Sequence, residues 1–91
     1  MDMTRHNPAL LHYSGILVVT GPNEIDDCIA DLESLPGVEV HFCDPERRRI
    51  ILVQETETIE AQEEGFRRIE ALPRVRMAAL VEHRVDPDGV W

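Results

Sequence analysis

A short phrase occurs twice in this sequence, and each copy combines a helix stop with the start of a strand. The copies are Glu33-Ser34-Leu35-Pro36-Gly37-Val38-Glu39-Val40 and Glu70-Ala71-Leu72-Pro73-Arg74-Val75-Arg76-Met77. Proline lacks an amide hydrogen and disfavours helical geometry in the residue before it, so each copy ends a helix near its leucine. The valine that follows begins an extended segment. The repeat therefore predicts a duplicated strand–helix–strand unit.

Four strands and two helices fit around these two stops. The strands are expected over residues 13–20, 38–43, 49–55 and 75–83, and the helices over 24–35 and from Thr56 or Thr58 to Leu72. Apolar and β-branched residues gather in the strand segments between turn signals, whereas apolar residues recur at helical spacing in the other two. The polar segment 44–48 joins the second and third strands as a hairpin loop.

Right-handed crossovers would place both helices on one face of the sheet, with the first and third strands in the middle. The predicted fold is α+β, a ferredoxin-like βαββαβ sandwich whose four-stranded antiparallel sheet has the order 4-1-3-2. The crossover argument also puts the first and third strands parallel to each other in the middle of the sheet. Residues 1–12 are expected to form a flexible N-terminal lead-in, 13–85 the domain and 86–91 a short C-terminal tail.

The charge balance limits the partners of this chain. Its 91 residues carry 18 acidic and 9 basic side chains, the latter all arginine, which gives a net charge of −9. Nucleic acid and membrane surfaces need a basic footprint and are disfavoured, whereas a cationic partner would be attracted. No apolar run could span a membrane and no secretory signal is visible, so we expect a cytoplasmic protein with Cys28 and Cys43 as reduced thiols.

The face of the sheet without helices, here called the open face, is the expected functional surface. Strict alternation, started from the charged ends of the last strand, gives it an apolar centre of Ile16, Val18, Ile51, Val53, Ala78 and Leu80. Glu39, Glu55 and Glu82 form an acidic rim. Such a patch usually marks an interaction surface, but a homodimer packed sheet on sheet would bury it equally well.

Catalytic and cofactor-binding patterns are missing from the sequence. It contains no G-x-S-x-G, Walker A or G-x-G-x-x-G motif, so we expect no enzyme. His41 and His83 fall on opposite edges of the predicted sheet and cannot share a metal within one chain, while His6 and His12 lie in the lead-in. We therefore expect no metal and no cofactor. A dimeric ACT-like regulatory domain that binds a small molecule remains the alternative.

Four phrases carry a family resemblance: Ile16-Leu17-Val18-Val19, Leu35-Pro36-Gly37-Val38-Glu39-Val40, Ile50-Ile51-Leu52-Val53 and Leu80-Val81-Glu82-His83. With the size and element order, they resemble the NapD family, the cytoplasmic assembly chaperones of periplasmic nitrate reductase. The similarity runs from about Gly15 to His83. Two departures are visible, since Arg74 stands where the family often has glycine and Glu82 where it often has an aromatic residue.

The resemblance implies a proofreading chaperone without catalytic activity or cofactor. Members of this family bind the twin-arginine signal peptide of the nitrate reductase catalytic subunit on the sheet face, where the peptide becomes helical. Binding delays export until the molybdenum cofactor is inserted and the enzyme has folded. A cationic peptide segment suits the net charge of −9, and an apolar segment suits the predicted patch. We expect this peptide as partner, neither nucleic acid nor membrane insertion, and leave a weak homodimer open.

Overall fold

The computed structural model describes residues 10–87, which form four strands and two helices. The elements are β1 (Leu10–Thr20), α1 (Ile25–Glu33), β2 (Val38–Asp44), β3 (Arg49–Thr56), α2 (Ile59–Ala71) and β4 (Val75–Pro87). Their sequence along the chain is the predicted βαββαβ. Within this part of the chain, neither helix is long and apolar enough to cross a membrane.

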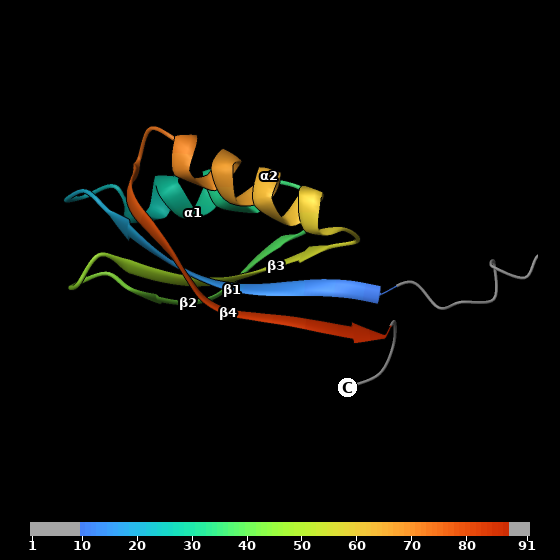
Figure 1. Ribbon diagram of the computed structural model, residues 1–91. Helices are drawn as coiled ribbons and strands as arrows, with labels where there is room; N and C mark the ends of the chain where they lie inside the picture. The colour runs from blue at the N-terminus through green and yellow to red at the C-terminus, as the bar shows by residue number, and fades with distance from the viewer. Residues whose placement is uncertain (1–9, 88–91) are drawn as a thin grey trace, which may run out of the picture.

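The strands form one sheet in the order β2-β3-β1-β4, which is the predicted order read from the other edge. β1 pairs antiparallel with β3 and β4, and β2 pairs antiparallel with β3. The expectation that the two central strands run parallel is therefore wrong, while the ferredoxin-like fold class is confirmed. Both helices lie against the same face of the sheet (Figure 1), and the other face has no helix over it among the described residues.

The hydrophobic core lies between the helices and the sheet. Its fully buried members are Ile16 and Val18 of β1, Ile50 and Leu52 of β3, Cys28 and Leu32 of α1, and Ile69 of α2. Every second residue of the two central strands points into this layer, as the two-residue period of a strand requires. The residues between them must face the other way.

Both copies of the repeated phrase form tight corners between a helix and a strand. In each copy the valine N–H donates to the carbonyl of the leucine, at 3.4 Å in the first and 3.1 Å in the second. The corners differ in the residue after proline. Gly37 has a φ of 73°, a conformation that side chains disfavour. Arg74 has no positive φ, and its Nη1 lies 2.8 Å from Oδ2 of Asp31 in α1.

Helix α2 shows why a glycine stands in its interior. The helix begins after Thr58, whose Oγ1 accepts a hydrogen bond from the Ala61 N–H at 2.9 Å. Gly65 is buried against β3, where an added Cβ would collide with the side chain of Gln54. Gln54 is itself 1% exposed and donates its Nε2 to the carbonyl of Gln62 at 3.2 Å. The glycine therefore makes room for a buried polar link between sheet and helix.

β1 and β4 form a two-stranded ribbon that extends beyond the helices (Figure 1). β1 begins at Leu10, and β4 continues to Pro87, which is its partner in the register. Both strands are longer than predicted, since β1 was expected to begin at Tyr13 and β4 to end at His83, yet His12 pairs within the sheet and is only 8% exposed. The remainder of the expected lead-in and tail, residues 1–9 and 88–91, lies outside the described residues and includes His6.

Candidate functional site

The pairing register shows which residues share the open face, because cross-strand partners point to the same side of an antiparallel sheet. Tyr13, Gly15, Leu17 and Val19 of β1 pair with Glu55, Val53, Ile51 and Arg49 of β3. The alternate residues of both strands fill the core beneath the helices. The two central strands therefore direct this set of eight toward the open face.

Four of the six predicted patch residues lie on the helix side of the sheet instead. Ile16 and Val18 have no exposed surface and belong to the core. Ala78 pairs with Val18 and packs against the same core, and Leu80 pairs with Ile16, although it remains 47% exposed. The prediction that these four side chains form the centre of the open face is wrong.

Two irregularities in β4 explain the error. Its pairing with β1 shifts on either side of a regular stretch, so that Arg76 and Val81 are each an extra residue in β4. A bulge of this kind reverses the alternation of side chains beyond it. Counting by twos from Glu82 across Val81 therefore assigns Leu80 to the wrong face. β1 offers no correction from sequence, because its centre is apolar on both faces.

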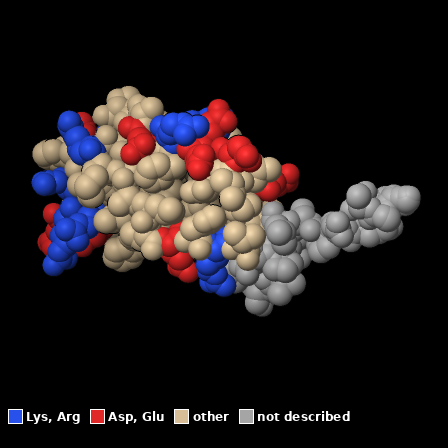
Figure 2. Space-filling view, viewed as in Figure 1, with Lys and Arg blue, Asp and Glu red and all other residues tan. Residues whose placement is uncertain are grey.

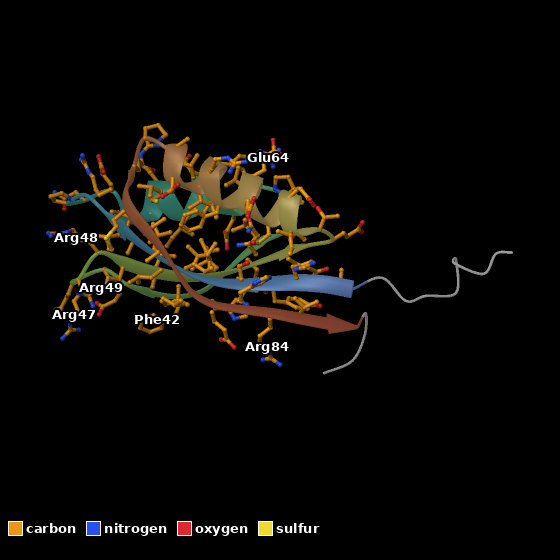
Figure 3. The ribbon with its side chains drawn as sticks, in the orientation of Figure 1. Phe42, Arg47, Arg48, Arg49, Glu64 and Arg84 are labelled. Carbon is orange, nitrogen blue, oxygen red and sulfur yellow. The ribbon has the colours of Figure 1, made fainter. Side chains whose placement is uncertain are left out.

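The structure gives the open face an apolar patch of different composition. Its members are Leu17, Val19, Phe42, Ile51, Val53, Met77 and Ala79. Ile51 and Val53 were placed there from the sequence as well. Phe42 was not, because a register shift at His41 reverses the alternation in β2 and pairs Phe42 with Ile51. Phe42 is 60% exposed and Met77 50%, and Phe42 points away from the helices in Figure 3.

The three acidic rim residues come together at one end of the open face. Glu39 of β2, Glu55 of β3 and Glu82 of β4 line one pocket of about 330 Å³. The other residues that line it are Tyr13, Gly15, Gly37, His41, Val53 and Arg84. Three strands thus supply one carboxylate each, and the apolar patch begins at the pocket wall with Val53.

Two glycines shape this pocket. The carbonyl of Gly37, in the corner before β2, accepts a hydrogen bond from the Glu55 N–H at 2.8 Å. A side chain on Gly37 would collide with the carbonyl oxygen of Glu55, so the corner can approach the end of β3 this closely only as glycine. Gly15 lies between Glu82 and Val53 in the sheet and leaves the floor of the pocket open.

Charge differs between the two ends of the open face. At the pocket end, the lining residues bring three carboxylates and one guanidinium, that of Arg84, which points away from the helices (Figure 3). The Nε2 of His41 lies 3.6 Å from Oε1 of Glu39 there. At the other end, Arg47, Arg48 and Arg49 gather at the hairpin between β2 and β3 (Figure 3).

The arginines of the hairpin are partly held in place by their neighbours. Nη1 of Arg47 donates to Oδ2 of Asp44 at 2.9 Å, and this bond lowers the pKa of the Asp44 carboxyl below its ordinary value. The carbonyl of Arg48 accepts from the Thr20 N–H at 2.9 Å, which ties the hairpin to the end of β1.

Acidic side chains also gather on the helix layer, in Figure 2 chiefly at the upper right.

Apart from His41, the histidines of residues 10–87 and both cysteines lie outside this arrangement. Nδ1 of His12 lies 3.2 Å from Nε2 of His83 across β1 and β4, a pair that the sequence did not predict. Among residues 10–87, no group of three His, Cys, Asp or Glu side chains could hold a metal ion. Both cysteines are free. Cys43 is exposed, whereas burial, followed by the nearby Asp31 carboxylate, raises the pKa of the Cys28 thiol to about 11.

Comparison with solved structures finds proteins of the same fold. No curated protein matches the chain. The solution structure of the Tat proofreading chaperone NapD from E. coli superposes with a TM-score of 0.76 at 24% identity, over 88% of this chain and 84% of that one. An AsnC-family transcriptional regulatory protein from Pyrococcus furiosus superposes with a TM-score of 0.60 at 19% identity, over 87% of this chain and 53% of the regulator. At these identities both structures show the fold alone.

The family comparison goes further than the structural ones. The family described as NapD protein matches residues 11–87, which include both helices and every residue of the pocket and the apolar patch. The match thus covers most of the 91 residues. The phrases that suggested this family in the sequence lie within it. This chain belongs to the NapD family.

Proposed function

We propose that this protein is a proofreading chaperone that binds the twin-arginine signal peptide of the periplasmic nitrate reductase catalytic subunit. By holding this peptide in the cytoplasm, it delays export until the cofactor is inserted and the enzyme has folded, and it catalyses no reaction itself. The observation that carries the proposal is the open face, where an apolar patch adjoins an acidic pocket on a side of the sheet that the helices leave uncovered.

The two parts of a signal peptide suit the two parts of this surface. Such a peptide has a cationic segment followed by an apolar one. The acidic pocket offers carboxylates from Glu39, Glu55 and Glu82 to the cationic segment. The exposed side chains of Phe42 and Met77 offer apolar area to the second segment. An amphipathic helix laid on an apolar surface is an established mode of peptide recognition.

The strength of such a complex follows from opposing contributions. Each large apolar side chain that the peptide covers contributes about 1.5–3 kcal/mol. Ordering of a flexible peptide offsets much of this gain. Rim carboxylates add less, about 1 kcal/mol or below for each exposed pair. Micromolar or somewhat tighter binding is expected, which is strong enough to retain a peptide and weak enough to release it.

Membership of the NapD family supports the nitrate reductase leader as the partner. The E. coli member whose structure resembles this one is described as a Tat proofreading chaperone. The surface of this chain suits any peptide with a cationic segment and an apolar segment, so the nitrate reductase leader is the family's contribution to the proposal. Leaders of other exported redox enzymes are the natural comparison in a binding experiment.

Isothermal titration calorimetry with a synthetic twin-arginine leader of the nitrate reductase catalytic subunit tests the proposal. We expect binding by the wild type and none by Phe42→Glu or Val53→Glu, because each change puts a carboxylate into the apolar patch. Ile59→Glu is the matched control, since Ile59 is also exposed, at 51%, but lies at the start of α2. Circular dichroism checks that all three variants fold.

Three outcomes would count against the proposal in different ways. Unchanged affinity in both folded open-face variants would place the peptide elsewhere on the molecule. Failure of the wild-type protein to bind the leader, while unrelated peptides also fail, would remove the chaperone function itself. Equal binding of leaders from unrelated exported enzymes would leave a chaperone without the proposed specificity.

A second candidate is a dimeric ACT-like regulatory domain that binds a small molecule. It is favoured by the likeness to part of an AsnC-family regulator, of which this chain spans about half. A dimer packed through the open face would bury Phe42 and Met77, so Phe42→Glu should convert it to a monomer. Analytical ultracentrifugation distinguishes the two functions, because a wild-type monomer at all concentrations contradicts the regulatory domain.

A further inference from the structure

The charges of the open face change sign along its strands. β3 crosses this face from Arg49, beside the arginines of the hairpin, to Glu55 in the wall of the acidic pocket. At the usual rise per residue of a strand, these two residues stand about 20 Å apart. Ile51 and Val53 lie between them on the same face. A molecule that follows β3 therefore meets carboxylates, then apolar side chains, then guanidinium groups.

The neighbouring strands widen the apolar middle and the acidic end, while β2 ends at the hairpin with Asp44, the cross-strand partner of Arg49. Beside β3, the apolar middle is widened by Leu17 of β1 and by Phe42 of β2. β4 contributes Glu82 at the pocket end and Met77 toward the hairpin end. The acidic end thus draws on β2, β3 and β4, and the guanidinium end on the hairpin between β2 and β3. A peptide helix of about 13 residues is also about 20 Å long, so one short helix could cover the whole gradient.

We infer that the open face fixes the direction of its peptide, an inference that rests on the proposed function. The paired arginines of the leader occupy the pocket lined by Glu39, Glu55 and Glu82. The apolar segment runs from there across Phe42 and Met77 and ends near the hairpin between β2 and β3. The carboxylates at the pocket end, the guanidinium groups at the hairpin end and the apolar patch between them all favour this direction.

The reverse direction is opposed at both ends. It would bring the arginines of the peptide beside Arg47, Arg48 and Arg49, which outnumber the two carboxylates of the same hairpin, so that like charges repel. It would also lay the apolar segment over the pocket, where Glu55 and Glu82 would lose water without gaining a partner.

Arg84 gives this inference a distinctive consequence. Among residues 10–87 it is the one arginine that lines the pocket, so its charge opposes a cationic ligand. Replacement by glutamine should therefore tighten binding of the leader, whereas the lysine variant, which keeps the charge, should not. A peptide that placed its arginines at the hairpin would be insensitive to this change.

A double-mutant cycle on the full-length protein provides the first test. The leader and a version with its two arginines replaced by glutamine are titrated against the wild type, Glu55→Gln, Glu82→Gln and Arg49→Gln. We expect each Glu→Gln variant to weaken binding of the natural leader by roughly fivefold and to leave the altered leader almost unaffected. Arg49→Gln should show no coupling with the peptide arginines.

The native cysteines allow a second test without new mutations at the site. Cys43 is exposed near the hairpin end, whereas Cys28 is buried, so a nitroxide reagent will label Cys43 alone. In spectra of isotopically labelled leader, broadening should be strongest at the end of the apolar segment and weakest at the arginine pair. The variant Cys43→Ser, treated in the same way, should show no broadening.

The outcomes separate this inference from the proposed function. If the wild type binds no leader, the proposed function fails. If the leader binds but shows no coupling with Glu55 or Glu82, or if broadening is strongest at its arginines, the direction is wrong while the chaperone function stands. Coupling at the pocket together with broadening at the apolar end supports the direction.

Discussion

The two faces of β3 carry similar apolar residues in very different surroundings. Leu52 faces the helices with no exposed surface, whereas Ile51, its neighbour in the chain, is half-buried on the open face. Their side chains are chemically alike, so the difference comes from what covers them. Apolar character in a central strand therefore shows that both faces are suited to burial, and the helices decide which of the two is filled by the protein itself.

The most direct test of this difference between the two faces of β3 is to make the same substitution on each face. Leu52→Asp should unfold the protein, because an unpaired buried carboxylate costs at least about 4 kcal/mol, most of the stability of a small domain. Ile51→Asp should remain folded and lose affinity for the leader peptide. Urea denaturation followed by circular dichroism measures the first effect and calorimetry the second. If both variants unfold, or if neither does, the assignment of faces is wrong.

Two glycines allow a milder version of the comparison. Gly65→Ala on the helix side forces a Cβ into the buried side chain of Gln54, and should lower the free energy of unfolding by about 1–3 kcal/mol. Gly15→Ala on the open face adds a Cβ at an ordinary 3.5 Å from that of Glu82. It should leave stability nearly unchanged while raising the floor of the pocket and weakening peptide binding. Equal losses of stability would contradict the difference in packing.

The cysteines give the smallest effect, which depends on pH. The Cys28 thiol has a pKa of about 11 in the folded protein against an ordinary value of 9.0. The unfolded chain therefore loses this proton first, and stability that is complete below pH 9 declines as the pH rises toward 11. The loss should reach about 1 kcal/mol at pH 10. Urea midpoints at pH 8 and pH 10 should show this decline in Cys43→Ala, and a smaller one in Cys28→Ala.

Much of the fold could be predicted because its signals are local. Pro36 and Pro73 end their helices through their own geometry, and the order of elements follows from hydrophobic spacing. The residues of β3 on the open face could also be identified from the sequence, because Arg49 and Glu55 mark that face at both ends of an uninterrupted strand. Ile51 and Val53 were assigned correctly for this reason.

The candidate site was harder to predict because it depends on pairing between strands. The register shifts at His41 and Val81 are set by neighbouring strands, and no local pattern marks them. Phe42 was therefore missed, and Leu80 was assigned to the wrong face. The acidic residues of the rim were named one by one, but their convergence on a single pocket required the register of all four strands.

The pairing of β1 with β4 has a consequence for how the protein is made. These are the first and last strands of the domain, and Leu10 pairs with Pro87. Contacts between residues so distant in sequence carry a large loop-closure cost and slow folding relative to helical proteins. β1 can pair with β3 first, but one of its two edges stays open until β4 is made, and β4 also supplies Met77 and Glu82 to the open face. The open face is therefore incomplete in a nascent chain until β4 has emerged.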